Sequence, residues 1–246
     1  MPANHTPNPT SPEPHPPAAA QDAALLLAGF LLLLAWDRSG LDLVAVRAWG
    51  TAAGFAWRDH WLTSNVLHGG SRVVGWLVVA ALAVGIWQPY GVLRRLTHRE
   101  RIWWVGTTLL CSVLILALKR ISATSCPWSL AEFGGTAHYV SHWARGVLDG
   151  GPGHCFPSGA ASTAFAFLPG WFALRNRAPR AAAWWLAGVV IAGTMVGVVQ
   201  MVRGAHYPSH TLWTAWLCWA LSAISYHAVV RRAVAAPAAA PVSPPA

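Results

Sequence analysis

The sequence predicts an all-α integral membrane protein, a bundle of about six transmembrane helices, and three observations lead to this prediction. Of its 246 residues, 55% are hydrophobic and only 10% are charged, whereas about a quarter of a typical soluble domain is charged. The apolar residues form long blocks that are nearly free of charge, each close to the roughly 17–25 residues that cross a bilayer. A segment in lipid must satisfy its backbone hydrogen bonds internally, which favours helices.

The six predicted spans are, in order, residues 19–36, 73–90, 102–118, 159–174, 182–202 and 211–230. The first is short unless Ala18–Ala20 join it, and the fourth contains Pro169, where a kink is expected. Residues 1–20 and 234–246 are rich in Pro and Ala. Such segments bury too little apolar surface to offset the entropy lost on ordering. We therefore expect two disordered tails around one membrane domain, residues 21–233.

The net charge of +9 is unevenly distributed and predicts the orientation. Basic clusters at 94–101, 175–180 and Arg231–Arg232 follow the second, fourth and sixth spans, so alternating crossings place them on one side. Short loops rich in Lys and Arg stay in the cytoplasm, which predicts that both termini are cytoplasmic. We interpret these arginines as topology and headgroup anchors rather than as a nucleic-acid site. The segments predicted to face outward are 37–72, 119–158 and 203–210.

Three polar clusters fall on this outward side and together indicate an anion site. The residues concerned are Lys119 and Arg120 in "LKRISATSCPW", Ser158 and Gly159 in "GHCFPSGAAS", and Arg203, His206 and His210 in "RGAHYPSH". Ser158 can cap the fourth helix, which leaves the N–H groups of Gly159 and Ala160 facing outward at its positive end. His206 offers a nucleophilic nitrogen that His210 can orient. Each cluster alone has an ordinary explanation, such as a lysine reaching toward headgroups, but their convergence favours a site.

Two of the four cysteines, Cys126 and Cys155, lie in the outward segment 119–158. A disulfide between them is permitted if that face is oxidising. Two unpaired thiols fit the sequence equally well, because spacing alone does not fix pairing. Cys111 and Cys218 lie within spans and are expected to be ordinary buried residues.

The order of these motifs resembles the type 2 phosphatidic acid phosphatase family, which includes integral membrane lipid phosphatases with six helices. That family shows Lys-x6-Arg-Pro, then Pro-Ser-Gly-His, then Ser-Arg-x5-His-x3-Asp. Lys119 matches the phosphate-binding lysine, Pro157–Gly159 match the second motif, and His206 matches the nucleophilic histidine. The wording "CPW" and "RGAH" is similar to a bacterial branch. The resemblance therefore implies the bacterial inner membrane, with a site facing the periplasm or exterior.

The chain departs from this pattern at several positions. Cys126 stands at the arginine before Pro127, Val199 and Gln200 at the Ser-Arg pair, His210 at the aspartate, and Ala160 at the histidine of Pro-Ser-Gly-His. Arg203, about one helical turn before His206, can supply the charge lost at position 200. Ala160 is the serious departure, because the histidine at that position protonates the leaving group in the mechanism that the resemblance implies.

That mechanism proceeds through a phosphohistidine and requires no metal or cofactor. Loss of a general acid costs about 10²–10⁴ in rate, so this copy is expected to be impaired and to favour diphosphate or aryl phosphate substrates. His154 is considered as a substitute acid, although a loop histidine is the simpler interpretation. Ala160 reflects either natural loss of function or a recent or engineered change. An abandoned site would also lose other residues, yet Lys119, Ser158, Gly159 and His206 remain, which favours a mutated enzyme.

The sequence thus predicts hydrolysis of the phosphate or diphosphate monoester of a membrane lipid. Two alternatives remain: non-catalytic binding or transport of lipid phosphates, and phosphotransfer between lipids. The expected partners are the bilayer and a lipid phosphate, without nucleic acid, and the lipid and the oligomeric state are left open. The segment 57–70, with Arg58, Asp59, His60 and His68, is interpreted as a solvated interfacial helix rather than a catalytic element.

Overall fold

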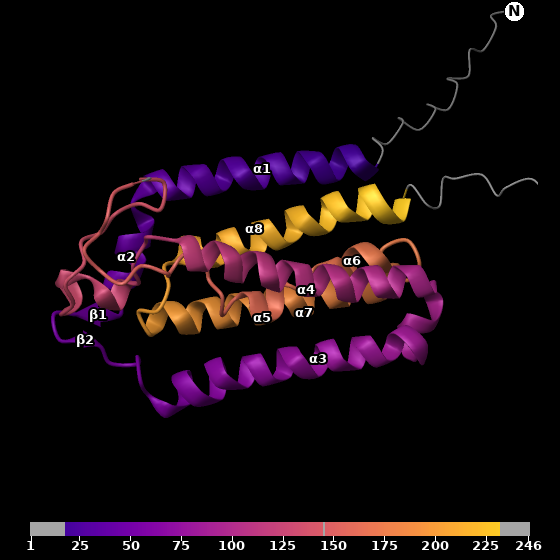
Figure 1. Ribbon diagram of the computed structural model, residues 1–246, viewed down its shortest axis with the longest axis horizontal. Helices are drawn as coiled ribbons and strands as arrows, with labels where there is room; N and C mark the ends of the chain where they lie inside the picture. The colour runs from indigo at the N-terminus through magenta and orange to yellow at the C-terminus, as the bar shows by residue number, and fades with distance from the viewer. Residues whose placement is uncertain (1–17, 145, 232–246) are drawn as a thin grey trace, which may run out of the picture.

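The computed structural model describes residues 18–144 and 146–231, and these are mainly helical (Figure 1). The helices are α1 (Ala18–Ser39), α2 (Leu41–Arg47), η1 (Leu62–Gly69), α3 (Gly70–Trp87), η2 (Gly91–Arg95), α4 (His98–Ile121), η3 (Pro127–Ser129), η4 (Ala131–Phe133), α5 (Ser162–Phe165), α6 (Pro169–Leu174), α7 (Pro179–Val202), α8 (Pro208–Ser225) and η5 (Tyr226–Arg231). Two short strands, β1 (Gly50–Thr51) and β2 (Gly54–Phe55), pair antiparallel. The predicted all-α membrane class is confirmed.

Within residues 18–144 and 146–231, four helical stretches are long and apolar enough to cross a membrane: Ala18–Ser39, Leu62–Arg95, His98–Ile121 and Pro179–Val202. The fourth predicted span is the shorter apolar stretch Ser162–Leu174, and the sixth is α8 continued by η5. Each of the six predicted blocks therefore falls on a helical segment, although only four meet the length and apolarity of a complete span.

The long helices run side by side along the longest axis of the molecule, and α5–α6 lies among them (Figure 1). The start of α1, the α3–α4 connection, the α6–α7 connection and the end of α8 lie at one end of the bundle. The opposite end carries α2, the hairpin and the long connection between α4 and α5. The basic segments 94–101 and 175–180 therefore share one end, as alternating crossings require.

The short α5–α6 segment contributes many residues to the core. The helix is interrupted before Pro169, where α6 begins. Proline lacks the N–H that would continue the helical ladder, so backbone groups near the break need other partners. The indole Nε1 of Trp185 on α7 donates to the carbonyl of Phe167 at 2.8 Å. Gly170 packs against the rings of Trp104 and Trp185, where a Cβ would collide. The kink expected at Pro169 is thus present as a division into two helices.

Two sequence-based boundaries are corrected. Ala18–Ala20 form the start of α1, because the apolar helix extends three residues into the predicted tail; residues 1–17 and 234–246 lie outside the described residues. The segment predicted as a surface helix at 57–70 instead contains η1, a π-helix that runs directly into α3. The second helical stretch consequently begins at Leu62 rather than at residue 73.

Candidate functional site

A cavity of about 430 Å³ at the end of the bundle opposite the basic connections brings the three polar clusters together. Its walls are His68, Arg72, Leu116, Lys119, Cys126, Trp128, Gly159, Ala160, Thr163, Gln200, Arg203, Ala205 and His206. Of the residues predicted from sequence, Lys119, Gly159, Arg203 and His206 line it, together with the Ala160 position.

His206 and His210 are both buried and face each other. Their Nδ1 atoms lie 3.4 Å apart, and Nδ1 of His206 is also 3.5 Å from Cys155 Sγ. The accessible nitrogen of His206 on the cavity side is therefore Nε2. Burial, and next the positive charge of Lys119, hold the pKa of His206 well below its usual value of 6.5. A neutral His206 that donates from Nδ1 to His210 keeps a lone pair on Nε2, which is the state that a nucleophile needs.

The turn that carries His206 is fixed from both sides. The carbonyl of Gln200 at the end of α7 accepts the N–H groups of Ala205 and His206, at 2.8 and 3.3 Å. At the start of α8, the carboxylate of Asp42 accepts hydrogen bonds from the N–H and the hydroxyl of Ser209. A negative charge at a helix N-terminus is favourable, so α2 helps to anchor the beginning of the helix that carries His210.

In the Pro-Ser-Gly turn, Ser158 does not take the phosphate-binding position predicted for it. Ser158 is fully buried, and its Oγ accepts the N–H of Ala161 at 3.3 Å, so its hydroxyl serves the turn and does not line the cavity. Gly159 and Ala160 do line the cavity, and their N–H groups have no protein acceptor within residues 18–144 and 146–231. The helix that follows, α5, has only four residues, so these two N–H groups, rather than the dipole of a full span, are available to an anion.

The basic side chains that line the cavity are Lys119, Arg203 and Arg72, whereas the sequence predicted Lys119, Arg120 and Arg203. Lys119 extends along Gly159, where a Cβ would lie only 3.4 Å from its Cδ. Arg120 is exposed and does not line the cavity, because successive helical residues point about 100° apart. Arg203 donates from Nε to the Arg58 carbonyl at 2.8 Å and from a terminal nitrogen to Gln200 Oε1 at 3.2 Å. Arg72 of α3 also lines the cavity.

Sequence reasoning missed the contribution of His68, Arg72 and Gln200 to the cavity wall. Nδ1 of His68 lies 2.7 Å from Nε2 of Gln200. The interfacial interpretation of His68 is therefore wrong, because η1 continues into α3 and carries this side chain into the bundle. His68 and Arg72 are four residues apart, which places both on one helical face. This spacing is the feature of the sequence from which their shared position could have been predicted.

Cys126 and Cys155 form a disulfide, one of the two alternatives that the sequence left open; the other was two unpaired thiols. It joins the segment after α4 to the segment before the Pro-Ser-Gly turn. Donor atoms of Cys155, His206 and His210 lie within 4.8 Å of one another, a spacing that suits a metal ion. The sulfur is bonded to Cys126, however, so it is not available as a thiolate ligand. His154, considered as a substitute acid, is exposed and does not line the cavity.

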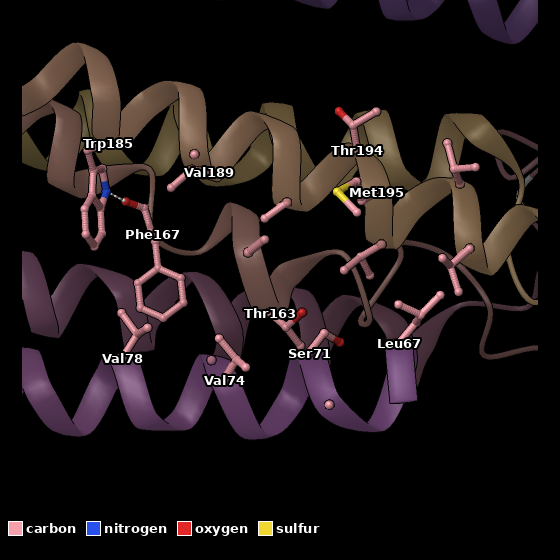
Figure 2. A pocket seen from close by; sticks show the side chains of 18 of the residues that line it. Leu67, Ser71, Val74, Val78, Thr163, Phe167, Trp185, Val189, Thr194 and Met195 are labelled. Atoms are coloured by element: carbon pink, nitrogen blue, oxygen red, sulfur yellow. Dashed lines mark hydrogen bonds between the residues drawn. The ribbon is translucent and has the colours of Figure 1, made fainter. Parts of the chain in front are cut away.

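A larger apolar cleft of about 810 Å³ adjoins the cavity. Figure 2 shows Ser71, Val74 and Val78 of α3 facing Val189 and Met195 of α7 across it. Thr163 and Phe167 lie between these two helices (Figure 2). Thr163 also lines the cavity that contains His206, so the two spaces share a wall.

Comparison with protein families identifies the chain. A family model described as the PAP2 superfamily matches residues 101–233, more than half of the chain. Comparisons with curated proteins and with solved structures found no match. The matched region begins within α4 and includes most of the cavity wall. The chain belongs to the PAP2 superfamily.

Proposed function

We propose, from this membership in a superfamily that generally comprises phosphatases of lipid phosphates, that the chain hydrolyses the phosphate or diphosphate monoester of a membrane lipid. The observation that carries the proposal is the position of His206. Its free Nε2 faces a cavity that is lined by Lys119, Arg72 and Arg203 and adjoins an apolar cleft. A neutral nucleophile beside fixed positive charges suits attack on a phosphate group.

In the proposed reaction, Nε2 of His206 attacks phosphorus, and the bond from phosphorus to the leaving oxygen breaks. The phosphohistidine that forms carries a proton on Nδ1, and the Nδ1 lone pair of His210 at 3.4 Å stabilises it. Lys119, Arg203 and the N–H groups of Gly159 and Ala160 hold the phosphoryl oxygens. A water molecule then cleaves the phosphorus–nitrogen bond, releasing phosphate and neutral His206.

The proposed site lacks a general acid at Ala160. This residue lines the cavity on the same turn as Gly159, and its methyl group holds no proton to give to the leaving oxygen. The leaving group must take its proton from water, which costs about 10²–10⁴ in rate for a poor leaving group. We therefore expect a weakened enzyme whose residual activity favours phosphate or aryl leaving groups.

The cleft between α3 and α7 supports a lipid as the substrate. Its walls are almost wholly apolar, and it shares Thr163 with the phosphate cavity, so one molecule can place a headgroup in the cavity and a hydrocarbon chain in the cleft. The cavity is lined from the end of α4, the end of α7 and the start of α3. These parts of the helices lie at the end of the bundle opposite the basic connections (Figure 1). With the positive-inside rule, this arrangement supports our proposal that the termini are cytoplasmic and that the cavity faces outward. The bacterial inner membrane, which the resemblance implies, remains part of the proposal.

The decisive experiment measures phosphate release by the purified chain and its Ala160→His variant from phosphatidic acid, a polyprenyl diphosphate and an aryl phosphate. We expect Ala160→His to raise turnover of phosphatidic acid by about 10²-fold or more, and a second His206→Ala change to abolish it. If Ala160→His stays inert on every substrate while lipid phosphates still bind, the chain is a binding or transport protein. Transfer of labelled phosphate to an added lipid alcohol would instead identify a phosphotransferase.

A further inference from the structure

The wall of the cavity that comes from η1 contains a histidine with no role in the reaction described so far. His68 is the penultimate residue of η1, is half-buried, and lines the cavity together with Lys119 and His206. Its Nδ1 is occupied by Gln200, whereas its Nε2 has no protein partner in the described part of the chain and is accessible from the cavity. One nitrogen is therefore fixed by the protein and the other is free for a ligand.

The partner of His68 determines which nitrogen carries the proton. The amide of Gln200 lies between His68 and Arg203, with Oε1 3.2 Å from the guanidinium and Nε2 2.7 Å from His68 Nδ1. A guanidinium can only donate hydrogen bonds, so the oxygen of Gln200 must face Arg203 and its NH₂ group must face His68. His68 consequently accepts at Nδ1, and its single proton sits on Nε2, toward the cavity.

The chain of contacts is itself well anchored. Gln200 is almost completely buried, at 1% exposure, and Arg203 is held from its other side by the Arg58 carbonyl at 2.8 Å. Rotating the Gln200 amide to suit a doubly protonated His68 would bring its NH₂ group against Arg203. Arg72, Lys119 and Arg203 line the same cavity, and their positive charges further disfavour a second proton on the ring.

We propose that His68 is a phosphate-binding residue of this site, which Gln200 holds as a neutral imidazole that donates from Nε2 to a phosphoryl oxygen. This inference rests on the proposed function and adds a third histidine to the site. His68 does not replace the acid missing at Ala160, because donation of the only proton of a neutral imidazole to an alkoxide would leave an imidazolate anion. Gln200 and Arg203 act on His68 as positioning residues.

The test compares two substitutions of His68 in the full chain and in its Ala160→His form. His68→Gln keeps an N–H near the position of Nε2, whereas His68→Asn places its amide near Nδ1 and loses the donor to the cavity. Binding of inorganic phosphate is measured by calorimetry, and KM and kcat are measured with phosphatidic acid and with an aryl phosphate. His154→Asn is the matched control, because His154 is exposed, lies outside the cavity and has a φ of 58° that asparagine tolerates.

We expect His68→Asn to weaken phosphate binding and to raise KM by about 10-fold or more, as for a lost hydrogen bond to a charged group. His68→Gln should stay within about threefold of its parent, and His154→Asn should be unchanged. Because the donor contacts an oxygen common to all phosphates, the loss should be equal for alkyl and aryl substrates. Gln200→Leu should cause a similar loss, and the double variant with His68→Asn should show no added effect.

Three results would overturn the proposal. If His68→Asn binds phosphate normally and keeps the kinetics of the active Ala160→His parent, His68 has no role, although the proposed function stands. If His68→Asn lowers kcat for phosphatidic acid far more than for an aryl phosphate, His68 is a general acid instead. If the parent chain neither binds phosphate nor gains activity from Ala160→His, the proposed function fails and this inference fails with it.

Discussion

At the scale of single residues, burial determines what His206 can do. The side chain is 4% exposed, and the loss of hydration together with the charge of Lys119 lowers its pKa. His206, the proposed nucleophile, is therefore neutral near pH 7, although the cavity that it faces is also lined by Lys119 and Arg203. His210 stands where the family pattern has an aspartate, and its Nδ1 lies 3.4 Å from Nδ1 of His206. In the proposed reaction it accepts a hydrogen bond there without adding a negative charge that would repel phosphate.

This burial predicts that the folded state is sensitive to acid. Because the pKa of His206 is lower in the folded chain than the usual 6.5, the unfolded chain binds a proton that the folded chain does not, and stability is lost as pH falls below about 6.5. No such contribution exists above that pH. We expect the Tm of the purified protein to fall as the pH is lowered from 7.5 to 5.5. The Tm of the His206→Gln variant should fall less over the same range. If His206→Gln and His154→Asn show the same acid sensitivity, His206 is not the cause.

At the scale of elements, the disulfide joins the two ends of the long connection between α4 and α5. Cys126 follows α4 and lines the cavity, whereas Cys155 precedes the turn that carries Gly159 and Ala160. The polypeptide between them contributes a further link, in which Asp149 accepts hydrogen bonds from the N–H and hydroxyl of Ser125. Both walls of the cavity are thus connected outside the membrane-spanning helices.

The pairing predicts the thiol content of the chain. Of the four cysteines, only the buried Cys111 and Cys218 are free, so alkylation of the unfolded, unreduced protein should label two residues, and prior reduction should raise this to four. Replacing Cys126 and Cys155 by serine should cost about 2–4 kcal/mol of stability. The change would appear as a lower Tm that reductant no longer affects. Labelling of four thiols without reduction would contradict the disulfide.

At the scale of the whole molecule, the apolar cleft beside the cavity that contains His206 leads us to predict, under the proposed function, selectivity for a long hydrocarbon chain. Gly188 of α7 lines the cleft and has open space where a Cβ would lie. In the Ala160→His form, Gly188→Leu should raise KM for phosphatidic acid by about 10-fold. The leucine would occupy space in the cleft and displace part of the hydrocarbon chain, so that apolar contact equal to roughly one side chain is lost. A water-soluble aryl phosphate should be unaffected, because it uses only the polar cavity.

Gly106 provides the control for this substitution. It lies on α4, is exposed, does not line the cleft, and also has open space around its Cβ position. Gly106→Leu should therefore leave both substrates unchanged. An equal rise in KM for both substrates in Gly188→Leu would show that the substitution disturbs the site itself and that the cleft does not hold the lipid.

The amino-acid sequence was sufficient to predict the membrane class, the helical segments, the shared end of the basic segments 94–101 and 175–180, and the proximity of Lys119, Gly159 and His206. These follow from local properties, namely runs of apolar residues, charge asymmetry and short motifs. They were enough to predict that the three polar clusters meet. They were not enough to place individual side chains within those clusters, as Ser158 and Arg120 show.

Which side chains face the cavity, and how they are oriented, depends on long-range packing that the sequence pattern does not contain. Lys119 and Arg120 are neighbours in sequence, yet helical geometry directs only the first into the site. His68 and Gln200 are separated by 132 positions, and their contact arises because η1 packs against α7. Hydropathy and motifs record which residues enter the membrane, whereas the direction and protonation of a side chain depend on partners that packing brings from distant parts of the chain.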